Sequence, residues 1–248
     1  MIRIKEFQLP KEVKVEQETL TDTYGKFFSE PLERGFGNTI GHALRRVLLS
    51  AIPGAAVTAL KIEEVSHEFS TLPGVKEDVT DIILNIKNLA LKMHHPKTME
   101  IHLKKHGPGM VTAKDLICDA NITVISPDLH IAALDKNGQI DMTLHVGMGF
   151  GYVPADQNKQ EGMPLGIIPI DAIFSPIRRV NCTVENARVG RMSHYNKLIL
   201  EIWTNGCIHP EEALREAARM LSAHIALFMN SGEEAQTDAP PPASTSST

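Results

Sequence analysis

Histidines are the first candidates for chemistry in this sequence, because a neutral imidazole can act as a metal ligand or a general base. The chain has 11 of them, but His94 and His95 are adjacent, so in a strand they would point to opposite faces. His67-Glu68 lacks the second histidine of the His-Glu-x-x-His zinc motif, and no Cys-x-x-Cys pair occurs. We therefore expect no metal and no cofactor. The alternative, a small metal-dependent enzyme that uses these three histidines, predicts stoichiometric metal in the purified protein.

The glycine-rich segment GFGNTIG offers a second kind of chemistry, the binding of a dinucleotide phosphate. Gly35 and Gly37 fit the first two positions of the motif G-x-G-x-x-G, but the third position is Ile40 and no strand–helix–strand unit surrounds it. The sequence contains no Walker-type phosphate loop and no G-x-S-x-G nucleophile motif. No catalytic triad or carboxylate pair stands out either. We therefore expect no catalytic residue.

Alternating apolar and polar residues indicate that strands dominate the chain. The strongest signal is Asn137-Gly138, which predicts a type I′ hairpin because both residues readily take positive φ angles. This hairpin would pair residues 129–136 with residues 140–146. Shorter alternating stretches lie at residues 12–16, 99–103, 180–184 and 198–203.

Three helices interrupt this pattern. The first follows Asn38, a good N-cap, and ends near Pro53-Gly54. The second follows Pro73-Gly74, and the third runs from Pro210 to about Asn230. We therefore expect an α+β fold with a long terminal helix.

The first and third helices have apolar residues on more than one face. In the first helix, an apolar arc that includes Leu44 and Val47 lies opposite an arc with Arg45 and Leu49, and Leu48 lies at the seam. Arginines beside an outward leucine are typical of a protein contact, although a helix buried on two sides explains the pattern equally well. The third helix is apolar on both sides, which favours self-association over packing within one chain.

Charge and composition limit the classes of function. Lys and Arg number 25 against 30 for Asp and Glu, the net charge is −5, and aromatic residues make up 5%. A domain that binds nucleic acid usually has a basic surplus, which is missing here. Four arginines at positions 178, 179, 188 and 191 form a short basic stretch. A solvated strand edge or a protein contact is favoured there, and an independent DNA-binding regulator stays open as the alternative.

Cysteines and terminal segments indicate the compartment. The three cysteines lie far apart, which suits a reducing compartment. The start, MIRIKEFQLP, has no apolar run of a signal peptide, and no stretch approaches the roughly 18 apolar residues of a membrane span. We expect a soluble, cytoplasmic protein with no membrane contact. Residues 231–248, SGEEAQTDAPPPASTSST, predict a disordered linker or tail.

The segment from Leu32 to Ser50, LERGFGNTIGHALRRVLLS, resembles the assembly motif of the α subunit of bacterial-type RNA polymerase. The resemblance covers nearly all of residues 1–230. It continues through PG at Pro53–Gly54, EFS at Glu68–Ser70, PGVKEDV at Pro73–Val79, LNIK at Leu84–Lys87, FSP at Phe174–Pro176, VENARV at Val184–Val189, TNG at Thr204–Gly206 and PEEA at Pro210–Ala213.

This resemblance implies a fold in two parts. A discontinuous dimerisation subdomain, a sheet plus two helices, would combine residues 1–52 with residues 178–230, and a mostly β subdomain would be inserted at residues 53–177. The first and third helices would pack against their copies in a second protomer. The dimer interface would use Phe36, Ile40, Leu44, Val47, Leu221, Ile225 and Phe228.

The function that the resemblance implies is a non-catalytic assembly scaffold. The homodimer would recruit the β and β′ subunits to build the core of a DNA-directed RNA polymerase. By motif match, Arg45 and Leu48 would contact the β subunit and Lys87 would lie in a large-subunit contact region; the outward face of the first helix adds Leu49. The family usually continues into a DNA-binding domain and this chain stops in the linker, so we expect no direct DNA binding from it.

Overall fold

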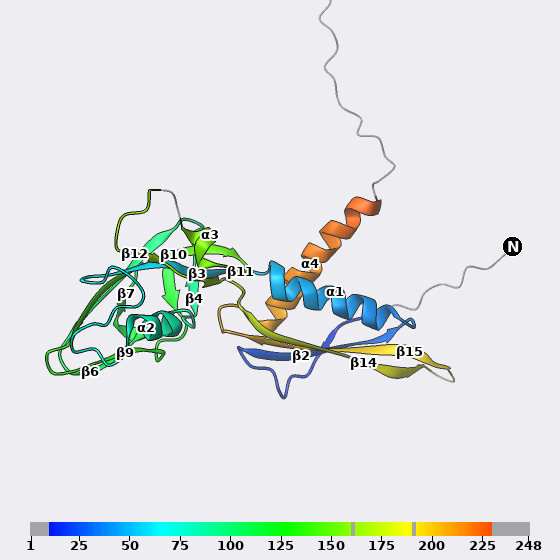
Figure 1. Cartoon of the computed structure of the whole chain (residues 1–248). Helices are drawn as coiled ribbons and strands as arrows, with labels where there is room; N and C mark the ends of the chain where they lie inside the picture. The colour runs from blue at the N-terminus through cyan, green and yellow to red at the C-terminus, as the bar shows by residue number, and fades with distance from the viewer. Residues whose placement is uncertain (1–9, 160–161, 190–191, 230–248) are drawn as a thin grey trace, which may run out of the picture.

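The computed structural model describes residues 10–159, 162–189 and 192–229. Figure 1 shows two parts side by side: a sheet with two helices above it, and a larger, mostly β part. The predicted tail at residues 231–248 lies outside the described residues. The fold is α+β, as the sequence predicted.

The smaller part is an antiparallel sheet in the order β1-β2-β15-β14. Its strands are β1 (Lys14–Val15), β2 (Tyr24–Leu32), β15 (Met192–Thr204) and β14 (Ile177–Val189). Helices α1 (Phe36–Ala51) and α4 (Pro210–Met229) lie over one face of it (Figure 1). Inward-pointing strand residues such as Phe27, Leu200 and Ile202 pack with Leu48 of α1 and Ala217 of α4, and this packing forms one hydrophobic core.

Helix α1 begins earlier than the sequence predicted. Its N-cap is Gly35, with a φ of 92° in the left-handed region, and Asn38 lies inside the first turn. No side chain caps the helix; instead the Gly35 N–H donates to Oδ1 of Asn196, 2.8 Å away on β15. The prediction of Asn38 as N-cap is wrong because a glycine can take the left-handed turn that brings the chain from β2 onto the sheet. The predicted end near Pro53 is confirmed.

The larger part is built on a sheet in the order β7-β5-β10-β3-β4-β8, with β12 also paired to β3. Two small pairs, β6 with β9 and β11 with β13, complete it. The bounds are β3 (Pro53–Ile62), β4 (Leu91–Met93), β5 (Met99–His106), β6 (Gly109–Thr112), β7 (Leu116–Ile117), β8 (Ile122–Val124), β9 (His130–Leu134), β10 (Gln139–Phe150), β11 (Tyr152–Val153), β12 (Ile167–Pro169) and β13 (Ala172–Ile173).

Short helices complete this larger part. They are α2 (Val79–Ile86), α3 (Ala155–Asn158) and the 3₁₀ turn η1 (Ala113–Asp115). Helix α2 follows Pro73-Gly74 as predicted: the Asp78 carboxylate caps it by accepting from the Asp81 N–H at 2.7 Å. Its apolar face, with Ile82 and Ile86 almost inaccessible, joins a second hydrophobic core formed by residues between Val57 and Ile170.

The predicted type I′ hairpin at Asn137-Gly138 is wrong. Neither residue has a positive φ, and β9 pairs with β6 while β10 lies between β3 and β5. A turn does form there, with the Gly138 N–H bonded to the Asp135 carbonyl at 3.0 Å. The Gly74 backbone packs directly against Gly138, and the Gly74 carbonyl accepts a hydrogen bond from the Asp135 N–H. Gly138 is therefore needed for the close approach of the Gly74 backbone and not for a hairpin turn.

Candidate protein-contact surfaces

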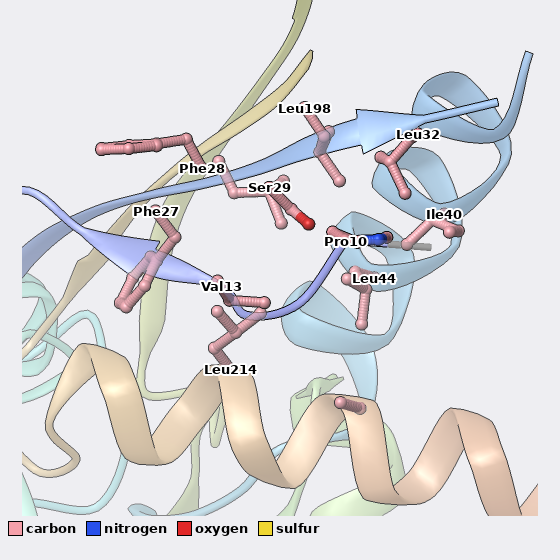
Figure 2. Close-up of a pocket in the computed structure, with 12 residues that line it drawn as sticks. Pro10, Val13, Phe27, Phe28, Ser29, Leu32, Ile40, Leu44, Leu198 and Leu214 are labelled. Carbon is pink, nitrogen blue, oxygen red and sulfur yellow. The ribbon is translucent and has the colours of Figure 1, made fainter. Parts of the chain in front are cut away.

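A nearly apolar groove lies between α1, α4 and the smaller sheet. Ile40 and Leu44 line it from α1, and Leu214 lines it from α4. Figure 2 shows these side chains converging with Leu32 and Leu198. The groove encloses about 370 Å³, and the other residues that line it are Pro10, Val13, Phe27, Phe28, Ser29, Leu200 and Ala218. It is therefore shaped to receive apolar side chains.

The second half of α4 extends past the sheet (Figure 1). The only buried residues of this helix are Pro210, Ala213 and Ala217, all in its first half. Large apolar side chains in the last turns are exposed, with exposed fractions of 51% for Ile225 and 80% for Phe228. A helix of 20 residues is about 30 Å long, and only the first half of α4 is buried against the sheet core.

The predicted dimer residues divide into two groups by burial. Leu44 is buried and forms a wall of the groove, and Ile40, Val47 and Leu221 are half-buried around the same core. Phe36, Ile225 and Phe228 are exposed. The structure thus brings Ile40 and Leu44 of α1 to the groove that Leu214 of α4 also lines, while Phe36 stands at the start of α1 and Phe228 near the end of α4.

The outer face of α1 requires one correction. Arg45 and Arg46 are exposed and Leu49 is half-buried, but Leu48 has no exposed surface and lies in the core under the helix. The prediction that Leu48 contacts a large subunit is therefore wrong. Arg45 is held in place, because its Nε donates to the Val180 carbonyl of β14 at 3.2 Å.

Leu48 is buried because it lies on the same face of α1 as three other buried residues. Gly37, Gly41, Leu44 and Leu48 are the buried residues of α1, and they follow the 4-3-4 spacing of one helix face. A Cβ added at Gly41 would meet Sγ of Cys182 and, at 2.7 Å, Cδ1 of Leu198. The two glycines thus let α1 approach the sheet closely. The four-residue spacing of Gly37 and Gly41 in GFGNTIG is therefore explained by helix–sheet packing.

Lys87, at the C-terminal end of α2, forms an ion pair with Asp171. Its Nζ lies 2.8 Å from Oδ2 of the carboxylate, whose Oδ1 accepts from the Ala155 N–H at 2.9 Å. The hydrogen bond from Lys87, followed by that from Ala155, holds the pKa of Asp171 below its ordinary value. Phe69 and Leu84, with 80% and 51% of their surfaces exposed, line a shallow pocket with the pair. Phe69 belongs to a motif of the resemblance, but sequence reasoning did not single it out.

A partly buried carboxylate, that of Glu77, anchors the segment that leads into α2. Glu77 accepts from the Ala133 N–H at 2.7 Å and bonds Nε2 of His130 at 2.8 Å. Burial alone would raise the pKa of Glu77, but these hydrogen bonds outweigh it and the pKa lies below 4.5. They tie the segment before α2 to β9.

The arginine stretch and the histidines do not converge on a site in the described residues. The Arg179 guanidinium lies over the Trp203 ring, 4.8 Å from its centroid, and Arg188 is exposed farther along β14; Arg191 lies outside the described residues. His94 contacts Thr123, and His67 contacts Ser70. Within the described ranges, no group of three His, Cys, Asp or Glu side chains could hold a metal ion. No helix of the same ranges is long and apolar enough to cross a membrane.

Comparison with known proteins gives the family. Residues 60–175 match the family model of the RNA polymerase Rpb3/RpoA insert domain. This defines the larger part of the fold as the insert domain of a polymerase subunit. Over its length, the chain belongs to the family of α subunits of DNA-directed RNA polymerase.

Three relatives carry that assignment, and each is described as the α subunit of DNA-directed RNA polymerase. The chain is 53% identical to the subunit of Geobacter metallireducens, over 92% of this chain and 67% of the relative. It is 57% identical to that of Symbiobacterium thermophilum, over 86% and 68%. It is 52% identical to that of Carboxydothermus hydrogenoformans, over 90% and 71%.

Proposed function

We propose that this chain is a non-catalytic subunit of a DNA-directed RNA polymerase, which dimerises and recruits the β and β′ subunits. Membership of the α-subunit family supports the polymerase role. The proposal takes residues 1–52 and 178–230 as the dimerisation subdomain and residues 53–177 as the inserted one. The observation that carries the dimer is an apolar groove beside α1 together with exposed apolar side chains in the last turns of α4.

The groove and the end of α4 are both apolar, which supports a two-fold dimer in which one covers the other. In an isologous interface each protomer offers the same patch, so the last turns of one α4 can lie against α1 and the groove of its partner, and the reverse. Full burial of one large apolar side chain contributes about 1.5–3 kcal/mol. Ile225, Phe228 and Phe36 count twice across a two-fold axis, and burial of their exposed fractions would contribute about 5–11 kcal/mol, of the same order as an association cost of about 4–15 kcal/mol.

The large subunits would bind away from this interface. On α1, Arg45 and Arg46 are exposed and Leu49 is half-buried, and the bond from Arg45 to the Val180 carbonyl holds that arginine beside β14. On the insert domain, Lys87 lies beside the exposed Phe69 and Leu84. A leucine beside two arginines, and an ion-paired lysine beside two apolar side chains, both have the composition of interface anchors.

A capture assay tests the recruiting role. The dimer of Arg45→Ala or Leu49→Ala should remain folded and bind the β subunit roughly thirtyfold more weakly, which corresponds to about 2 kcal/mol for an interface anchor. Lys136→Ala, in an exposed turn of the insert domain, is the matched control and should bind normally. If both α1 variants capture the β subunit as well as the control does, the assigned contact face is wrong.

A further inference from the structure

The two covalent connections between the smaller sheet and the insert domain lie together. One runs from α1 into β3 at Ile52–Gly54, and the other runs from β13 to β14 through Phe174–Pro176. They touch closely, because a Cβ added at Gly54 would meet the Phe174 carbonyl and, at 3.3 Å, Cδ of Pro176. Two crossings at one place form a single pivot. By themselves they would let one part rotate against the other.

A third contact lies at the turn between β15 and α4, residues 204–208. The Thr204 N–H donates to the Thr23 carbonyl at 2.8 Å, and the Asn205 N–H donates to the Pro176 carbonyl at 2.9 Å. The turn is also closed on itself, because Oδ1 of Asn205 accepts from the Cys207 N–H at 3.0 Å. These bonds fix the turn to the smaller sheet and to the returning connection.

From this turn, two residues reach the insert domain. Sγ of Cys207 lies 3.2 Å from the carbonyl oxygen of Leu91, a buried residue of β4. Burial raises the pKa of the Cys207 thiol, so the group stays protonated and can donate this bond. Gly206 has a φ of 90°, and a Cβ there would lie 2.9 Å from Cγ2 of Ile125, the residue after β8. Any larger residue would push the insert domain away.

We propose that the 204–208 turn is a non-covalent joint that fixes the orientation of the insert domain, with Gly206 and Cys207 as its positioning residues. The turn is bonded to the pivot at Pro176 and adds contacts with Leu91 and Ile125, which belong to neither connection, so these added contacts restrain rotation about the pivot. This inference concerns the internal geometry of one chain, so it does not depend on dimerisation or on recruitment of the large subunits.

Alkylation of Cys207 by iodoacetamide tests the joint, because Cys207 is only partly exposed and its thiol is bonded to the Leu91 carbonyl, so opening of the contact should make Sγ react faster. The full chain is used with Cys118→Ala and Cys182→Ala, so that Cys207 is the remaining thiol. Gly206→Ala should raise the alkylation rate about tenfold or more, since it adds both backbone strain and a contact with Ile125. Gly107→Ala is the matched control: Gly107 has a φ of 83°, but an added Cβ there meets nothing within 4 Å.

A second variant separates opening of the joint from strain in the turn. Ile125→Ala removes the facing side chain from the insert domain and leaves the turn itself unchanged, and it should also raise the alkylation rate of Cys207. Circular dichroism checks that each variant is folded; if Gly206→Ala does not fold, Ile125→Ala alone decides. Faster alkylation in Ile125→Ala than in Gly107→Ala supports the joint. Equal rates in the folded variants would overturn it.

Discussion

The Lys87 ammonium and the Asp171 carboxylate lie 2.8 Å apart and join the end of α2 to the segment between β12 and β13. The pair holds a lysine that would otherwise be mobile beside the exposed Phe69 and Leu84. Behind it, the hydrogen bonds of Glu77 fix the start of α2 to β9. The proposed large-subunit contact on the insert domain is therefore presented in a defined geometry.

Asp171→Asn should cost little stability, and the cost should depend on pH. The amide oxygen can still accept from the Ala155 N–H, so the variant loses the ion pair alone. The side chains of Lys87 and Asp171 are 22% and 32% exposed, so we expect a loss of about 0.5 kcal/mol at neutral pH in urea unfolding.

The pH dependence has a defined sign. The pKa of Asp171 is lowered from 3.8 by the Lys87 hydrogen bond, so the contribution is present above pH 3.8 and is lost as the pH falls through the lower folded pKa. A difference between wild type and Asp171→Asn that stayed constant from neutral to about pH 3 would contradict this ion-pair contribution.

Leu48→Ala should destabilise the protein far more than Leu49→Ala. Leu48 has no exposed surface, so its truncation leaves a cavity between α1 and the sheet, at a cost of about 2–5 kcal/mol. Leu49 is only half-buried, and its truncation should mainly affect capture of the β subunit. Urea unfolding at one protein concentration compares the two. Equal losses would mean that Leu48 is not the core residue of the pair.

Gly41→Ala should destabilise the protein although alanine favours helices. In an exposed helix the change would gain about 1 kcal/mol of helix propensity. Here the new Cβ would meet Cys182 and Leu198, and overpacking of this kind costs about 1–3 kcal/mol. His42→Ala, at the exposed neighbouring position, is the control and should cause no such loss. A rise in unfolding midpoint for Gly41→Ala would show that α1 does not pack closely at this glycine.

Much of the fold was predictable from sequence because its signals are local. Pro73-Gly74 ahead of α2 and Pro210 in the first turn of α4 act on their own helices, and both predicted helices are confirmed. The burial of Leu48 was not predicted, because the face that meets the sheet is marked by two glycines, which add nothing to a hydrophobic pattern. Asn137-Gly138 was misread for a similar reason: the approach of Gly74, distant in sequence, decides its conformation.

The contact surfaces were predictable only in part, and mainly through the resemblance. Periodicity alone did not decide whether the outer face of α1 contacts a partner or is buried within the chain, since arginines beside a leucine are compatible with both. The groove needs residues from β2, α1, β15 and α4 together, and sequence spacing does not report that convergence.

The Tyr24 phenol should titrate well above the usual range. Burial, followed by the 2.9 Å hydrogen bond that the hydroxyl donates to Oε1 of Glu201, raises the pKa of Tyr24 to about 12. Because the folded pKa is raised, its contribution to stability is present below pH 10 and is lost as the pH rises from 10 toward 12. Glu201→Gln should lower this pKa toward 10, its ordinary value.

Ultraviolet absorbance of the phenolate follows this titration, and Tyr24→Phe assigns it among the three tyrosines. If the transition that disappears in Tyr24→Phe lies at about pH 10, the buried hydrogen bond to Glu201 does not hold the phenol in its neutral form.

The most direct test of the central claim is the mass in solution, measured by light scattering over a range of concentrations. The groove and the α4 end predict a stable dimer, with a mass near twice 27.3 kDa. Ile225→Lys, exposed in the single chain, should stay folded and shift the mass toward 27.3 kDa. The control Met110→Lys, also exposed and on β6, should remain dimeric. A wild-type monomer at every concentration would contradict the dimer on which the proposed assembly role rests.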